Sequence, residues 1–114
     1  GHAPVHEIEM QKAQPNWQNR LTATPTLARE AFGARNYHFN PDRFRNFTPP
    51  TLLLVGSETT PFYKAATEAL HRALAGSRVK VLNGQGHEGV VFAPQLFLRE
   101  VLEFLRQELD FSLR

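Results

Sequence analysis

The chain has 114 residues, of which 41% are hydrophobic, a formal net charge of +2 and no cysteine. Its length suits one small globular domain or part of a larger one, and the slight positive charge does not by itself indicate a polyanionic partner. Without cysteine the chain forms neither disulfides nor thiolate metal sites, which fits a reducing compartment, so we expect a cytoplasmic protein.

The sequence carries neither a membrane segment nor a visible secretory signal. The longest uninterrupted apolar run covers only residues 52–55, far below the length of a membrane span, so no membrane partner is expected. Residues 1–2, a glycine and a histidine, read as a cloning remnant rather than a biological start, because no initiator methionine precedes them.

Residues 3–48 are polar and interrupted by proline, and we expect them to form short helical pieces. Pro15 should separate two of these pieces, since proline removes a backbone hydrogen bond within a helix. Thr24-Pro25 has the form of an N-cap followed by a first helical position, with Gly33 as the stop. Asn40-Pro41-Asp42 then favours a turn.

Residues 49–114 have the pattern of the α/β class. TLLLVG (51–56) is a short apolar run closed by glycine, as expected of a parallel strand covered on both faces. A helix should run from Thr60-Pro61 to Gly76, a second strand over 78–82 and an amphipathic helix over 92–109. Strand, helix and strand have the usual size of a right-handed βαβ crossover.

This parallel βαβα unit predicts an incomplete sheet. Two parallel strands cannot cover both faces of a strand as apolar as residues 51–56, and a two-stranded sheet is marginal in water. Further strands must come from a partner chain or from the rest of a longer α/β protein. We therefore expect self-association through exposed apolar strand edges, or association with a missing N-terminal half.

The stretch VLNGQGHEGV (81–90) allows two interpretations. Gly84, Gly86 and Gly89 match G-x-G-x-x-G, but a dinucleotide loop belongs in the first βα turn and needs an acidic residue at the end of the next strand. Only the final helix follows here, so no cofactor is expected. The other interpretation is a strand-end loop whose small residues present His87.

A strand, a small-residue loop ending in Gly-His and a last helix resemble the end of the α/β-hydrolase fold. PPTLLLVGSETTPFYKAATEAL and SRVKVLNGQGHEGVVFAPQLFLREVLEFLRQ look like the last two strands and helices of that superfamily. NYHFNPDRFRNFTPPTLLLVG is similar to the passage from cap into core in its esterase-like and C–C-bond hydrolase-like branches. The resemblance covers roughly residues 13–109, and its most specific part is the pairing of TLLLVGSE with GQGH.

The resemblance implies that residues 49–114 are the C-terminal part of an α/β-hydrolase core, preceded by a helical cap over 3–48. His87 would be the catalytic base of a serine hydrolase with a small ester-like substrate. In this family the acid often follows the strand matching 51–56, which makes Glu58 the candidate. Some members carry the acid after the preceding strand, and Glu58 could instead be a first-turn glutamate favoured by the helix dipole.

The serine nucleophile of such an enzyme is not in this chain. Ser57, Ser77 and Ser112 are the only serines, and none of them stands in G-x-S-x-G. Ser57 follows the wrong strand and lacks the sharp glycine-flanked elbow. The segment alone is therefore expected to be inactive.

Nucleic-acid binding is a rival interpretation of the first half. Arg35, Arg43 and Arg45 interleave with aromatic residues, and bases stack on aromatic rings beside arginines. However, Asp42 lies inside this cluster and nothing else in the chain is strongly basic, so no nucleic-acid partner is expected.

Two further classes complete the alternatives. A metal site is not expected, because His87 and Glu88 are adjacent rather than spaced as ligands, and His71 has no second ligand one helical turn away. A non-catalytic interaction module that keeps a hydrolase-like shape remains the alternative to the enzyme, and it predicts that no G-x-S-x-G lies upstream.

Overall fold

The computed structural model describes residues 5–35 and 37–113, and the proposed cloning remnant at residues 1–2 lies outside them. The chain divides into two compact units, one running up to Asn40 and the other starting at Pro41. The second unit begins before Pro49-Pro50 because a 3-10 helix, η1 (Pro41–Phe44), contacts the first α-helix of that unit, α4 (Pro61–Ala73).

The described residues of the first unit form three helices, α1 (Val5–Lys12), α2 (Trp17–Thr22) and α3 (Thr24–Ala34). Pro15 lies between α1 and α2, as expected because proline lacks the backbone N–H that a helix interior requires. Two expected helix ends are wrong. Ala23 rather than Thr24 is the N-cap of α3, since its carbonyl accepts from the amides of Thr26 and Leu27, and Gly33 lies inside the helix.

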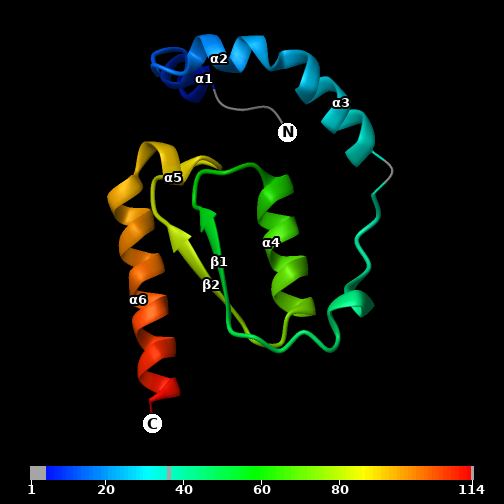
Figure 1. Ribbon diagram of the computed structural model, residues 1–114, viewed down its shortest axis with the longest axis vertical. Coiled ribbons are helices and arrows are strands. Elements are labelled where there is room, and N and C mark those ends of the chain that lie inside the picture. The colour runs from blue at the N-terminus through cyan, green and yellow to red at the C-terminus, as the bar shows by residue number, and fades with distance from the viewer. Residues whose placement is uncertain (1–4, 36, 114) are drawn as a thin grey trace. The chain divides into compact units, whose positions relative to one another are not determined.

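The second unit contains a parallel two-stranded sheet of β1 (Thr51–Gly56) and β2 (Ser77–Leu82), joined by α4. Thr51 lies opposite Ser77, and the register continues to Gly56 opposite Leu82. This confirms the predicted βαβ unit, with β1 at the expected residues. The two strands point toward the same end of the unit as α5 (Gly89–Phe92), and α4 and α6 (Pro94–Ser112) flank them (Figure 1).

The last helix starts later than the sequence predicts. The pattern indicates a continuous helix from residue 92, but α5 ends at Phe92 and α6 begins at Pro94. Ala93 separates them, with φ −138° and ψ 61°, outside the helical region. Proline at the first position of α6 costs no hydrogen bond there, because that amide has no partner within the helix.

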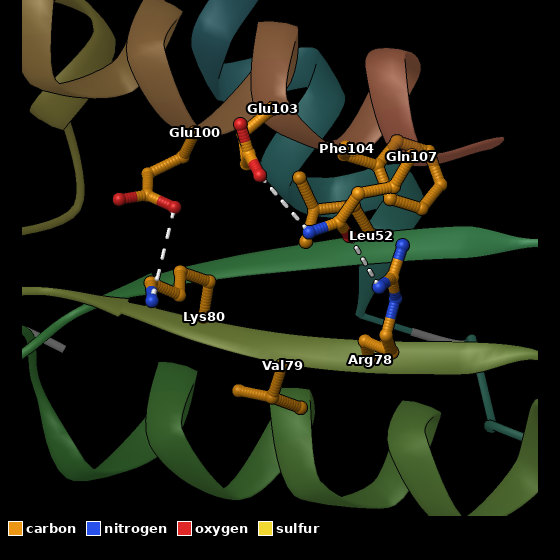
Figure 2. A pocket seen from close by; sticks show the side chains of 8 residues that line it. All are labelled: Leu52, Arg78, Val79, Lys80, Glu100, Glu103, Phe104 and Gln107. Carbon is orange, nitrogen blue, oxygen red and sulfur yellow. Dashed lines mark hydrogen bonds and ion pairs between the residues drawn. The ribbon is translucent and has the colours of Figure 1, made fainter. Parts of the chain in front are cut away.

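Polar side chains of β2 connect the sheet to α6. The Arg78 guanidinium donates to Gln107 Oε1 at 2.7 Å and to Glu108 Oε1 at 3.0 Å, and it lies 5.0 Å from the centre of the Phe104 ring. Lys80 lies 3.9 Å from the Glu100 carboxylate. Figure 2 shows Arg78 and Lys80 directed toward α6, while Val79 between them points toward α4, as strand alternation requires.

Few apolar side chains of the described residues are buried. Leu74 and Leu82 are the buried hydrophobic residues, and the four apolar residues at 52–55 in β1 are only half-buried. Along α6 an outward stripe is more than half exposed: Leu98, Leu102, Leu105 and Leu109. A two-stranded sheet with one helix on each face covers too little of its own apolar surface, as the sequence predicts.

Candidate active site

The carboxyl ends of the two strands meet at one edge of the sheet, where three hydrogen bonds hold the loop after β2 against the end of β1. The Ser57 amide donates to the Leu82 carbonyl at 3.0 Å and the Glu58 amide to the Gln85 carbonyl at 2.8 Å. The Gly84 amide donates to Ser57 Oγ at 2.8 Å. Residues 83–86 are therefore fastened to residues 57 and 58 across the sheet edge.

Two glycines make this close approach possible. A Cβ on Gly56 would lie 2.7 Å from the Gln85 carbonyl carbon and nearer still to the carbonyl oxygens of Gln85 and Gly86, so no side chain fits there. Gly84 has φ +77°, a conformation that other residues rarely adopt. Gly84 therefore lets the loop turn tightly, whereas Gly86 has no positive φ.

His87 follows this loop and is exposed. Its imidazole stacks on the ring of Tyr63, with ring centres 3.7 Å apart and ring planes 5° from parallel. Tyr63 lies in the first turn of α4 and is half-buried. Among the described residues, no hydrogen bond or ion pair holds the His87 ring, so its orientation depends on the loop backbone and on Tyr63.

Glu58 lies at the same edge but is not paired with His87. Its amide holds the His87 loop through Gln85, while its side chain is exposed. Within the described part of the chain, no hydrogen bond joins the Glu58 carboxylate to the His87 imidazole. The structure therefore brings the two predicted residues to one sheet edge without forming the acid–base contact of a triad.

Ser57 has a structural role in this arrangement. Its hydroxyl oxygen accepts the Gly84 amide, which ties the glycine loop to β1. A serine occupied in this way, without the glycine-flanked elbow that exposes a nucleophile, closes the loop rather than attacking a substrate.

A serine–histidine pair that the sequence pattern does not reveal lies at the opposite end of β2. Ser77 Oγ lies 2.8 Å from His71 Nδ1, but Ser77 is buried and donates its hydroxyl proton to the Leu74 carbonyl at 2.7 Å. With the hydroxyl proton on this carbonyl, the imidazole would donate to the serine oxygen as its Nδ1–H tautomer, the reverse of what a general base does. The pair closes the turn between α4 and β2. The six-residue separation across a turn gives no recognisable sequence signal.

The cavity in Figure 2 is not part of the candidate site. It has a volume of about 190 Å³ and lies between β2 and α6, where Arg78, Lys80 and Glu100 line it. These charged groups are already paired: Arg78 with Gln107 and Glu108, and Lys80 with Glu100. Neither His87 nor Glu58 borders it.

An ion pair on α6 shifts the pKa values of both of its partners. The Arg106 guanidinium, which donates to Glu103 Oε1 at 2.6 Å, holds the pKa of the Glu103 carboxyl below its ordinary value, and the carboxylate raises the pKa of Arg106. The described residues contain no group of three or more histidine, aspartate or glutamate side chains placed to hold a metal ion. None of the described helices has the length and apolar character needed to cross a membrane.

Comparisons with protein-family models, curated proteins and solved structures find no match to this chain.

Proposed function

We propose that this chain is the C-terminal segment of a serine hydrolase, esterase-like or C–C-bond hydrolase-like, and that it supplies the catalytic histidine, His87. The observation that carries the proposal is the fastening of the His87 loop to the end of β1 through Ser57 and Glu58. This arrangement supports a base held at the carboxyl edge of a parallel sheet, where α/β folds bind their ligands.

The reaction we propose is acyl transfer to water in two steps. His87 takes the proton from a serine hydroxyl supplied by the N-terminal half, as that oxygen attacks the substrate carbonyl carbon, and it then gives the proton to the leaving group. Water hydrolyses the serine ester in the second step, with His87 again as the base. Glu58 is the proposed acid, and its exposed side chain would have to turn toward the imidazole to pair with it.

The test uses this chain together with the serine-bearing half encoded upstream. We expect turnover of a small aryl ester by the whole enzyme to fall by several orders of magnitude in His87→Ala, and Glu58→Gln to cost a comparable amount if Glu58 is the acid. The chain alone should not be labelled by a serine-directed phosphonate. Comparable turnover in the His87 variant and the wild type would overturn the assignment. Unchanged turnover in Glu58→Gln would mean only that another residue is the acid.

A non-catalytic interaction module is the second candidate, and two observations favour it. Glu58 and His87 are unpaired with each other, and the leucine stripe of α6 is exposed as in a binding surface. The two candidates differ in the coding sequence upstream of Ala3. A G-x-S-x-G motif there supports the hydrolase, and its absence supports the module.

A further inference from the structure

One aromatic side chain among the described residues contacts the His87 ring. The imidazole and the Tyr63 ring are nearly parallel, at 5°, with their centres 3.7 Å apart. No other side chain of the described residues forms a ring contact, hydrogen bond or ion pair with this imidazole. Removing the Tyr63 ring would leave the His87 side chain free to take other rotamers, because the residue is exposed.

Tyr63 is itself well fixed. It belongs to the first turn of α4, which begins at Pro61 and follows Thr60 in an extended conformation. The Phe62 ring meets the Tyr63 ring edge-on at 5.2 Å, and the Tyr63 carbonyl accepts the Thr67 hydroxyl at 2.8 Å. The α4 backbone therefore fixes where the Tyr63 ring begins, and the half-buried ring is more restrained than the exposed imidazole stacked on it.

The stack leaves the reactive atoms of the imidazole available. Stacking covers a face of the ring, while Nδ1 and Nε2 both lie on its edge, where hydrogen bonds form in the ring plane. One nitrogen can therefore face a serine hydroxyl while the other faces a carboxylate. A hydrogen-bonding neighbour in place of Tyr63 would occupy one of these nitrogens.

We propose that Tyr63 is a positioning residue for His87: its ring stacks on the imidazole and holds it in the orientation needed for proton transfer, without contacting the substrate. This inference rests on the proposed function and extends it to a residue outside the triad. It also predicts that the aromatic ring is what matters and that the phenol hydroxyl is dispensable.

The first experiment tests the stack on the 114-residue chain itself, by NMR of histidine-labelled protein. We expect the His87 ring protons to be shifted upfield and to show cross-peaks to the Tyr63 ring, in the wild type and in Tyr63→Phe. Both signals should be lost in Tyr63→Leu. Phe111→Leu, which removes an exposed aromatic ring of α6 that has no ring contact with His87, is the matched control. Unchanged His87 signals in Tyr63→Leu would overturn the proposal.

The second experiment measures the consequence for catalysis in the whole enzyme. Tyr63→Leu should lower kcat by about tenfold to a hundredfold with little change in KM, because misplacement of a catalytic group by about 1 Å can cost a hundredfold. Tyr63→Phe, which keeps the aromatic ring, should have the wild-type kcat. A Tyr63→Leu enzyme with unchanged kcat would overturn the positioning role, even if NMR detects the stack.

The two experiments distinguish failure of the proposed function from failure of the Tyr63 proposal. An inactive wild-type enzyme would overturn the proposed function, and with it the catalytic part of the Tyr63 proposal. The NMR comparison would still decide whether Tyr63 orients the imidazole. Circular dichroism of each variant identifies a loss of fold, and Tyr63→Phe provides the test if the leucine variant does not fold.

Discussion

At the scale of single residues, Gly56 is the position on which the candidate site depends most directly. Its missing side chain lets the carbonyls of Gln85 and Gly86 lie against β1, and the adjacent Ser57 and Glu58 then bind the same loop. From the sequence Gly56 reads only as the end of a strand. Its close contact with a loop about thirty residues later depends on strand pairing, which sequence spacing alone does not give.

Gly56→Ala should lower the free energy of unfolding by about 1–3 kcal/mol, since the added methyl group forces the backbone of the loop to move. Urea unfolding followed by circular dichroism measures the change. Gly33→Ala is the matched control, because Gly33 lies in α3 with nothing within 4 Å of an added Cβ, and it should be neutral or slightly stabilising. A Gly56→Ala chain as stable as the wild type would contradict this close packing of the loop on β1.

At the scale of elements, strands were easier to predict than helix ends. β1 occupies residues 51–56 as expected, because a short, uninterrupted apolar run closed by glycine is typical of a buried strand. The start of α3 differs from the sequence prediction because α2 ends just before it, so that Ala23 caps both helices and Thr24 is already helical. In the candidate site, Glu58 and His87 each follow a strand of the predicted parallel pair, which accounts for their common sheet edge. The side-chain directions and the Tyr63 stack were not predictable from spacing.

The ion pairs along α6 give a prediction on pH at this scale. Because hydrogen bonding to Arg106 lowers the pKa of the folded Glu103 carboxyl, its stabilising contribution is present above the pKa of the unfolded chain and is lost as the pH falls through the folded value. The effect on stability should be small and should weaken in salt, since both groups are exposed.

An NMR titration of the Glu103 side-chain carboxyl carbon measures this effect. In Arg106→Gln the midpoint should move upward from its wild-type position, toward that of an unpaired glutamate. Arg72→Gln removes the same charge from α4 and should leave the Glu103 midpoint unchanged. A midpoint that does not respond to Arg106→Gln would show that the pair does not persist in solution.

At the scale of the whole molecule, the apolar surface exceeds what the described elements can cover. The sheet-facing side of α6 includes the half-buried Phe104, while Leu98, Leu102, Leu105 and Leu109 form a second stripe that faces away. The apolar character of β1 predicted this shortage from the sequence. The sequence did not identify α6 as a second exposed apolar surface, because an amphipathic pattern shows which residues are apolar but not how many of them pack against another element.

We expect the isolated chain to self-associate through this stripe, because burying apolar surface contributes about 25 cal/mol per Å². Sedimentation velocity over a range of concentrations should show dimers or larger species for the wild type. Leu102→Glu combined with Leu105→Glu should shift the distribution toward monomer, because each charge would have to be buried in the contact. Ala65→Glu, which adds a charge at an exposed position of α4, should leave the association unchanged. Association that persists in the double variant would indicate that the chains contact each other through the open strand edges instead. A wild-type monomer with a sharp thermal transition would show that the leucine stripe is stable when exposed to solvent.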